Sequence, residues 1–457
     1  MNADFFDTTI GDQLTLQRGF DITKKEQVPG DVPVVSSGGV SSHHNEAKVE
    51  APGVVLGRKG SLGTVFFLEE NFWPHDTTLW VKDFKNNNPQ YVYYFFLNMS
   101  EQLKRMDVGA ANPALNRNHV HPIEIRWPLR PIQDKAVEVL SSLDKKIQRN
   151  NQINRTLEQM AQAIFKSWFV DFDPVKSKMA VHEADGSEEE VLLAAMQAIS
   201  GKDANQLARQ QAEQPEQYAE LRTTAALFPA TMQQSELGEV PEGWEVSQLG
   251  GCLDTLETGA RPKGGVKGIT DGVPSVGAEN ILGVGNYKYG KEKFVPHEFF
   301  DKLKRGVVEH LDCLLYKDGG KPGDFRPRVS MFGCEFPYDT FAINEHVFRM
   351  RSERLGQPFL YFQIGHERVL AELRHRGAKA AIPGINQKDV NTIWVVCPSP
   401  KVLRTFNNII EGMISSILTR SKENLRLSDL RDALLPKLLS GELTLPEGEE
   451  LCSQVAV

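Results

Sequence analysis

The run G-R-K-G-S-L-G at residues 57–63 contains the glycines and the lysine of a phosphate-binding loop, so nucleotide chemistry is the first hypothesis to consider. A P-loop has the pattern GxxxxGK[ST], in which the lysine follows the second glycine and reaches the terminal phosphates. Here Lys59 precedes Gly60, and apolar residues flank the run on both sides. We therefore predict a glycine-rich turn between two strands, whose Arg58 and Lys59 could contact a phosphate backbone.

Methyl transfer is the second chemistry to consider. The segment N-P-A-L at residues 112–115 is similar to the Asn-Pro-Pro-aromatic motif of amino-methyltransferases, in which the aromatic ring stacks on a flipped base. No aromatic residue is present here, and no G-x-G loop follows a predicted strand to bind S-adenosylmethionine. We expect no methyltransferase activity in this chain.

Metal-dependent hydrolysis has no better support. The acids of D-F-D-P-V-K at residues 171–176 lack the spaced, strand-borne carboxylates of a metal-dependent nuclease, and we expect this segment to end a helix. The histidines form no H-E-x-x-H, and His43 and His44 are more typical of a solvated turn. The sequence predicts no catalytic residue and no metal site.

Basic residues offer a different chemistry, because several of them cluster near predicted turns where they could contact DNA. Residues 245–400 include 21 basic and 19 acidic residues, so this is clustering and not an excess, and an ordinary solvated surface is the alternative. The predicted DNA-binding residues are Arg18, Lys24, Lys25, Arg58, Lys59, Ser61 and Arg117 in the N-terminal half, with Arg261, Lys263, Lys317, Lys321, Arg326 and Arg328 in the C-terminal half.

The net charge of −8 does not exclude DNA as a partner, because the acidic residues are unevenly distributed. Residues 181–244 include 12 acidic and 3 basic residues, a net charge of −9, so the rest of the chain carries −8 + 9 = +1. The acidic total therefore describes one segment.

Length and composition limit the class of protein. A chain of 457 residues is too long for one ordinary core, and 40% hydrophobic with 25% charged residues is typical of a soluble globular protein. No apolar run is long enough to span a membrane, and the N-terminus lacks the features of a secretion signal. The five scattered cysteines, without a C-x-x-C, fit a reducing cytoplasm, which is the expected location.

An internal repeat indicates the elements that must position the basic residues. A-N-P-A-L-N-R-N-H-V at residues 111–120 returns as A-I-P-G-I-N-Q-K-D-V at residues 381–390, an offset of 270 (381 − 111). The offset continues without a gap into an apolar heptad pattern of about four heptads in each copy, which predicts two long helices that pack on each other. Their predicted core residues are Leu140, Leu143, Ile147, Leu157, Ile410, Met413, Ile417 and Leu427.

Polar residues interrupt both heptad patterns midway. They could fix the register of the two helices, or this zone could face another subunit. A single pattern of this kind could also be an ordinary amphipathic core helix, but two gap-free copies favour a helix pair, in which about 39 residues of helix from Pro131 would span roughly 58 Å. The interrupting residues are Asn150, Asn154, Arg420 and Asn424.

Segments rich in glycine and β-forming residues precede each repeated segment, in the same order but with little identity. They predict two sheet-rich globular domains of mixed α+β class, each followed by one copy of the helix. A helix is also expected within the acidic linker at residues 188–199. The predicted boundaries are 1–128 and 244–398 for the two domains, 129–176 and 399–443 for the helices, 177–243 for the linker and 444–457 for a C-terminal tail.

Taken together, the chain resembles the DNA-specificity subunit of type I restriction-modification enzymes over essentially its whole length. The resemblance rests on the two-copy layout and on P-x-[LI]-N at residues 113–116 and 383–386. It also rests on S-W-F-V-D-F-D-P-V at 167–175 and on S-E-L-G-E-V-P-E-G-W-E-V at 235–246. Each motif alone is weak, and the combination is specific.

The resemblance implies an α+β fold with two target recognition domains separated by two long antiparallel coiled-coil helices, related by a pseudo-two-fold axis. Each domain would read one half of an asymmetric bipartite DNA site, because half-sites about one DNA turn (roughly 34 Å) apart need two readers at a fixed distance. Within the domains, the basic residues of the glycine-rich loops are the ones expected to contact DNA.

The resemblance also implies partners. Two modification subunits would bind S-adenosylmethionine and methylate adenine, and restriction subunits driven by ATP, with Mg²⁺, would join them. This chain would itself be non-catalytic and hold no cofactor. The alternative from another class is a structural or interaction protein, in which two sheet-rich modules on a coiled-coil arm bind protein and not DNA.

Overall fold

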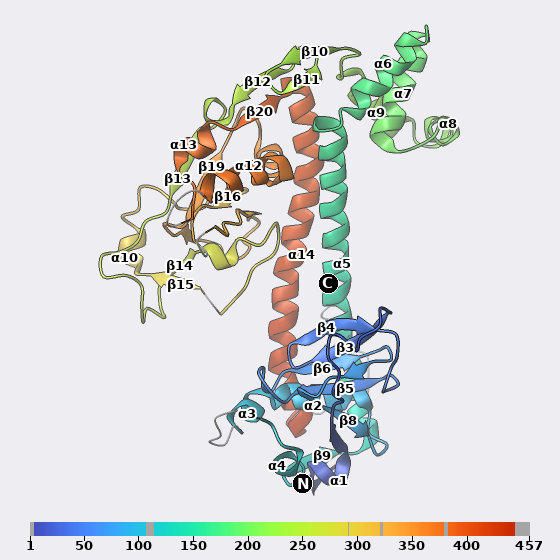
Figure 1. Cartoon of the computed structure of the whole chain (residues 1–457), viewed down its shortest axis with the longest axis vertical. Helices are drawn as coiled ribbons and strands as arrows, with labels where there is room; N and C mark the ends of the chain where they lie inside the picture. Colours follow the sequence, from blue (N-terminus) through green and yellow to red (C-terminus); the bar gives the residue numbers. More distant parts are fainter. Residues whose placement is uncertain (1–3, 107–113, 291, 320–322, 379–382, 444–457) are drawn as a thin grey trace. The chain divides into compact units, whose positions relative to one another are not determined.

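The computed structural model describes residues 4–106, 114–290, 292–319, 323–378 and 383–443 (Figure 1). The chain divides into two compact units, of which the first comprises Met1–Gln148 with Leu425–Val457 and the second Arg149–Asn424. We call the sheet-rich part of the first unit, residues 4–128, module 1, and that of the second unit, residues 245–398, module 2. Within the described residues, no helix is long and apolar enough to cross a membrane.

Module 1 contains two small sheets. An antiparallel sheet has the strand order β2, β8, β5, β6, and a second sheet has the order β4, β3, β7, in which β3 and β7 are parallel. The inner strand β5, G-V-V-L-G, is buried along its whole length, which explains its continuous apolar sequence. The strands are β2 (Thr15–Arg18), β3 (Val32–Ser36), β4 (Gly39–His44), β5 (Gly53–Gly57), β6 (Val65–Leu68), β7 (Trp73–Pro74) and β8 (Thr78–Asp83).

Helix α2 (Pro89–Asn98) packs against β5 and β6 and supplies much of the core of module 1. It begins where it does because the Asn88 side chain accepts hydrogen bonds from the N–H groups of Gln90 and Tyr91, and Pro89 has no N–H that would need a partner. The remaining elements are β1 (Phe5–Thr9), α1 (Ile10–Gln13), α3 (Ser100–Arg105), α4 (Arg117–Val120) and β9 (Glu124–Pro128), with β1 and β9 paired antiparallel.

Module 2 repeats this topology strand for strand. Its sheets have the orders β13, β19, β16, β17 and β15, β14, β18, with β14 and β18 parallel, and β12 pairs with β20 as β1 does with β9. The strands are β12 (Glu245–Gln248), β13 (Thr255–Thr258), β14 (Val273–Val276), β15 (Lys293–Val295), β16 (Cys313–Tyr316), β17 (Val329–Met331), β18 (Ala342–Ile343), β19 (Val347–Arg351) and β20 (Trp394–Cys397). The helices are η1 (Leu249–Gly251), η2 (Ala278–Asn280), α10 (His297–Phe300), α11 (Gln357–Gly365), α12 (Glu367–Gly377) and α13 (Gln387–Asn391).

The 270-residue offset holds in the structure. Helix α4 begins at Arg117 and α13 at Gln387, and β9 begins at Glu124 and β20 at Trp394. The long helices α5 (Arg130–Phe169) and α14 (Pro400–Ser440) begin at the same offset. The predicted α+β fold, with two sheet-rich regions and a pair of long helices that pack together, is therefore confirmed.

Helices α5 and α14 pack antiparallel within each unit (Figure 1). In the first unit, Arg431 Nη1 donates to Asp144 Oδ1 at 2.9 Å, and Leu140 shares a core with Leu435 and Leu438. Of the predicted core residues, Leu140, Leu143, Ile410, Ile417 and Leu427 are buried, whereas Ile147, Leu157 and Met413 are half-buried.

The polar residues within the heptad pattern join the two helices of the second unit. Buried Asn150 donates from Nδ2 to Glu423 Oε2 at 2.7 Å and to Asn424 Oδ1 at 2.9 Å. Asn154 Nδ2 lies 3.3 Å from Ser421 Oγ. Because these amides meet in only one alignment of the helices, the contacts support the register-fixing interpretation. Arg420 instead bonds within its own helix, to the Ser416 carbonyl at 3.0 Å.

The acidic linker forms a small helical assembly. The expected helix at 188–199 is present as α7, and a capping box in which Ser187 and Glu190 exchange hydrogen bonds explains its start. A hairpin of β10 (Met232–Ser235) and β11 (Gly238–Pro241) then leads into module 2. The helices are α6 (Asp173–Glu183), α7 (Glu188–Ser200), α8 (Ala204–Glu213) and α9 (Pro215–Ala226), and their core is Ala195, Met196, Leu207 and Ala225.

The segment 129–176, expected to be one helix, contains a turn, because α5 ends at Phe169 and α6 begins at Asp173. Phe172 adopts a left-handed conformation at the turn (φ 57°). The Phe169 and Phe172 rings each lie 5.8 Å from the Trp244 ring. The motifs at residues 167–175 and 235–246 therefore pack on each other, which brings the two ends of the linker together.

Candidate nucleic-acid interface

The loops that carry basic residues in module 1 converge on the turn between β7 and β8, residues 75–77. The N–H groups of Arg58 and Lys59 both donate to the Thr77 carbonyl, at 2.9 and 3.0 Å. A Cβ atom at Gly19 would lie 2.1 Å from the His75 carbonyl oxygen, so this close approach requires glycine. The glycine-rich run after β5 is the turn between strands that its sequence predicts.

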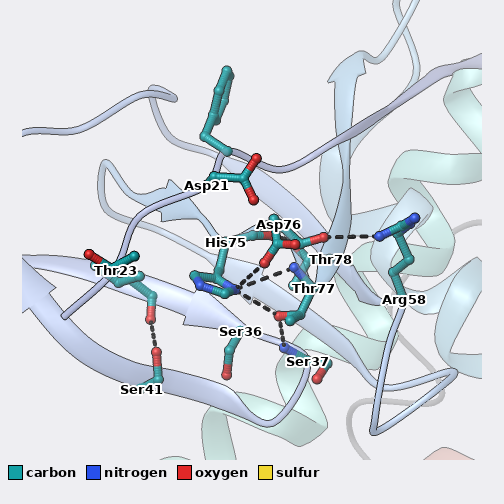
Figure 2. Close-up of polar contacts among 12 residues, drawn as sticks. Asp21, Thr23, Ser36, Ser37, Ser41, Arg58, His75, Asp76, Thr77 and Thr78 are labelled. Carbon is teal, nitrogen blue, oxygen red and sulfur yellow. Dashed lines mark hydrogen bonds and ion pairs between the residues drawn. The ribbon is translucent and has the colours of Figure 1, made fainter. Parts of the chain in front are cut away.

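The turn itself is a polar cluster (Figure 2). The His75 Nδ1 atom lies 3.0 Å from Asp76 Oδ1 and 3.1 Å from Thr77 Oγ1. Arg58 Nη1 donates to the Asp76 carbonyl oxygen at 3.2 Å, and the Ser37 N–H donates to Thr77 Oγ1 at 3.3 Å. These contacts fix the Arg58 side chain and the β3–β4 turn relative to the β7–β8 turn.

Three predicted DNA-binding arginines of module 1 line one groove of about 580 Å³. Arg18 ends β2, Arg58 follows β5 and Arg117 begins α4. Arginine and amide side chains are the types that form paired hydrogen bonds with guanine and adenine edges. The groove is also lined by Gln17, Gly19, Phe20, Leu79, Leu115, Asn116 and Asn118.

Residues 115–118 of the repeated segment form one wall of this groove. The Leu115 N–H donates to the Arg58 carbonyl at 2.9 Å. The Asn116 side chain caps α4 by accepting from the Asn118 N–H at 3.0 Å, which fixes Arg117 as the first residue of that helix. Leu115 and Asn116 of the P-x-[LI]-N motif therefore connect the groove to the start of α4.

Behind the wall, His121 holds strand β2 in place. Its Nε2 accepts a hydrogen bond from the Leu16 N–H at 3.0 Å, which requires an unprotonated Nε2. Burial, together with the nearby charges of Arg117 and Lys85, lowers the pKa of His121 and favours this neutral form.

The other predicted residues of module 1 lie outside the groove. Lys24 and Lys25 are exposed on the loop after β2, and Lys59 and Ser61 are exposed on the turn after β5. Exposed cations beside a groove are suited to phosphate contacts, which position a protein on DNA without reading sequence.

We call the loops that meet at the β7–β8 turn of module 1 its loop edge. Module 2 has a corresponding loop edge around the turn between β18 and β19, residues 344–346. The Lys317 N–H donates to the His346 carbonyl at 3.0 Å, and the Ile385 N–H donates to the Lys317 carbonyl at 2.7 Å. Lys317 therefore corresponds to Arg58. Gly259 corresponds to Gly19, since its Cβ would lie 1.8 Å from the Ile343 carbonyl oxygen.

The predicted DNA-binding residues of module 2 are more dispersed than the three arginines that line the groove of module 1. Lys317 pairs with Asp318 and lies over the Phe348 ring at 5.6 Å, and Arg261 Nη1 pairs with Glu345 Oε1 at 3.2 Å. The other predicted residues are Lys263, which is exposed, Arg326, which is exposed and pairs with Asp324 at 2.7 Å, and Lys321, which lies outside the described residues.

Arg328 lies in different surroundings. Its Nη2 donates to the Ala278 carbonyl at 2.8 Å, and its guanidinium lies over the Tyr316 ring at 5.2 Å. It lines a mainly apolar cavity of about 560 Å³ with residues of α5 and α11, including Phe165 and Phe362. Its role as a DNA contact stays a prediction.

Sequence reasoning missed the two carboxylates at the centre of these turns. Asp76 Oδ2 pairs with Arg18 Nη2 at 3.1 Å, as Glu345 pairs with Arg261 in module 2. The available signal was the match between H-D-T at 75–77 and N-E-H at 344–346, each between corresponding strands. A search for basic residues does not find it.

Chemically, the two loop edges are suited to binding. In the part of the chain that the structure describes, no three His, Cys, Asp or Glu side chains are placed to hold a metal ion. Cations and amides around a groove supply hydrogen-bond donors to phosphate oxygens and base edges.

This chain is similar to known proteins. The model of the type I restriction modification DNA specificity domain matches residues 3–159. The type I restriction enzyme HindI specificity subunit of Haemophilus influenzae is 31% identical over 356 residues, which cover 72% of this chain and 71% of that protein. The MjaIX specificity subunit of Methanocaldococcus jannaschii is 22% identical over 360 residues, which cover 78% of this chain and 70% of that protein.

A solved structure shows the same fold. The crystal structure of a type I restriction-modification system S subunit from M. genitalium superimposes with a TM-score of 0.53 over 98% of both chains, at 14% sequence identity.

Proposed function

The chain belongs to the DNA-specificity subunits of type I restriction enzymes, and from this premise we propose that its two modules each read one half of a bipartite DNA target. The specificity subunit is the non-catalytic component of these enzymes. The observation that carries the proposal is the repetition of one loop edge, on one topology, with different side chains in each copy.

The side chains differ where base contacts would be made. Arg18 lies opposite Leu79 in β8, and the matching position in module 2 is Thr258, opposite Phe348 in β19. Arg117 corresponds to Gln387 at the offset of 270. Because arginine, threonine and glutamine favour different base edges, we expect two different half-sites and an asymmetric target.

We further propose that α5 and α14 dock two modification subunits, and that restriction subunits join this core. In support, both helices expose large apolar side chains, Met160 at 47% and Ile409 at 38%, which a partner could cover. S-adenosylmethionine, ATP and Mg²⁺ would be bound by those partners, and the helix pair would set the spacing of the half-sites.

Salt-dependent binding tests the DNA proposal. The chain, with its modification subunits, is titrated onto a duplex that contains the target and onto a scrambled duplex, between about 50 and 200 mM salt. We expect preferential binding to the target, with the logarithm of affinity falling linearly with the logarithm of salt concentration as counterions are released. Equal, salt-insensitive binding to both duplexes, or no binding to either, would favour the protein-binding alternative.

A further inference from the structure

Both modules place a carboxylate in the middle of the same three-residue turn and pair it with an arginine. The Asp76–Arg18 distance is 3.1 Å and the Glu345–Arg261 distance is 3.2 Å. A histidine flanks each carboxylate: His75 Nδ1 lies 3.0 Å from Asp76, and His346 Nε2 lies 3.6 Å from Glu345.

The two arginines come from different backbone positions. Arg18 is the last residue of β2, whereas the matching residue of module 2 is Thr258, and Arg261 follows in the loop after β13. The carboxylates occupy the same position, and the arginines reach them by different routes. The pair is therefore not a simple consequence of the shared backbone.

Fold stability does not account for these pairs. The side chains of Arg18 and Arg261 are 50% and 57% exposed, and ion pairs at such exposure contribute only about 0–1 kcal/mol. A carboxylate does, however, restrict an arginine to one orientation. Within the described residues, the hydrogen bonds of Arg18, to Asp76 and to the exposed Asp21, all involve Nη2, and that of Arg261 involves Nη1, so the other guanidinium N–H groups of each can donate to a ligand.

We propose that Asp76 and Glu345 are positioning residues, which hold Arg18 and Arg261 for paired hydrogen bonds to the O6 and N7 atoms of a guanine, one in each half-site. The inference rests on the proposed function and specifies part of it. Guanine is the base that presents two acceptors to an arginine in the major groove, and such a pair typically discriminates by about 5- to 150-fold.

The carboxylates make the proposal specific. If Arg18 is removed, Asp76 remains as an acceptor in the same place, and a carboxylate accepts from the cytosine N4 amino group but not from guanine O6 or N7. Arg18→Ala should therefore change one position of one half-site from guanine toward cytosine. Asp76→Asn should keep guanine with weaker discrimination, and Asp76→Glu, with the carboxylate of the other module, should restore it.

The test is a map of methylated-adenine motifs in cells that carry the complete system with each variant. Arg18→Ala and Asp76→Asn should alter one half-site, and Arg261→Ala and Glu345→Gln the other. Arg374→Ala removes a similarly exposed (48%), ion-paired arginine that is not among the predicted DNA-binding residues, and it should alter neither. Thermal unfolding of each variant shows whether the chain remains folded.

The outcomes separate the inference from the proposed function. Uniformly weaker methylation, with base preferences unchanged in both half-sites, would overturn the positioning role and leave bipartite reading intact. A change spread over both half-sites by either module's variants would contradict the proposed function as well. A change confined to one position of one half-site supports both.

Discussion

Trp80 and Arg349 occupy the same place in the two modules and have opposite chemistry. Trp80 lies opposite Val55 in β5, and Arg349 lies opposite Leu314 in β16. Trp80 packs in an apolar cluster with Val35, Val55, Leu68 and Phe72. Arg349, equally buried, pairs with Glu257 at 2.8 Å, with Glu309 at 2.7 Å and with Asp312.

The difference shows which features of the repeat the fold requires. Strand order and the backbone hydrogen bonds around the loop edge are the same in both modules, whereas the layer beneath is apolar in one and ionic in the other. Each arrangement suits its own residues: Trp80 packs among apolar side chains, and the buried guanidinium of Arg349 is surrounded by the carboxylates that it needs. Module sequences can therefore diverge almost completely on one backbone.

The largest expected effect comes from removing the buried arginine. Arg349→Ala would leave the fully buried Asp312 with one cationic partner, Arg351, among the described residues, and loss of one partner in a buried ion pair costs about 3–5 kcal/mol. Burial already raises the pKa of Asp312, against the opposing effects of the Glu309 N–H and of Arg349. Urea unfolding, with hydrogen exchange at β19 to localise the change, measures the loss of stability.

The matched control is Arg374→Ala. Arg374 is 48% exposed and pairs with Glu367 at 3.4 Å, so its loss should cost no more than about 1 kcal/mol. Equal effects of the two substitutions would contradict a buried ionic layer in module 2.

The second-largest effect expected is a loss of stability from a substitution at Gly57, where the turn after β5 begins. A Cβ at Gly57 would lie 2.0 Å from the Ser61 carbonyl oxygen, whereas the matching residue of module 2 is Tyr316. Gly57→Ala should cost about 1–3 kcal/mol, as crowded substitutions do, and weaken DNA binding by displacing the turn. Gly38→Ala, whose Cβ meets only the Ser36 hydroxyl at 3.9 Å, should change little in thermal unfolding and DNA titration.

A smaller effect should follow from making the two modules alike at the groove. Arg117→Gln introduces the residue found at 387, and this exchange of one base-edge contact for another should shift the base preferred at one position of that half-site, with the slope of log affinity against log salt little changed. Arg105→Gln, at an exposed position of α3 outside the groove, serves as control. If Arg117→Gln instead leaves base preference unchanged and reduces that slope by about 1, Arg117 contacts a phosphate and not a base.

The smallest effect is the pH dependence that His121 contributes to the stability of module 1. Because the folded-state pKa of His121 is lowered, the unfolded chain binds the proton first as the pH falls below about 6.5, so stability is lost on acidification. The matching residue of module 2 is Asn391. His121→Asn should therefore reduce the fall in thermal midpoint between about pH 7.5 and 5.5, and an unchanged fall would refute the assignment to His121.

Much of the fold follows from the sequence because it depends on patterns that a single chain displays. The 270-residue offset locates both copies of α4, β9 and the long helix, since helix periodicity and a capping asparagine are local signals. The apolar runs that become β5 and β16 are likewise visible. The turn at Phe172 is not visible in the sequence, because an aromatic residue gives no sign of a left-handed conformation.

The site is less predictable, because it depends on contacts between distant segments. The arginines Arg18, Arg58 and Arg117 were predicted by residue type alone, and only the fold shows that they share a groove. The pairing of Asp76 with Arg18 spans 58 residues, and no spacing rule connects them. An acidic residue such as Asp76, placed among basic residues, is also not a feature by which composition indicates DNA binding.

Independent reading of the two half-sites by the two modules is the main proposal for this chain. It is tested most directly by replacing residues 1–110 with the corresponding segment of another specificity subunit and mapping the methylated-adenine motif. One half of the motif should change, while the other half and the spacing between the two halves should be retained. A motif changed in both halves would contradict it.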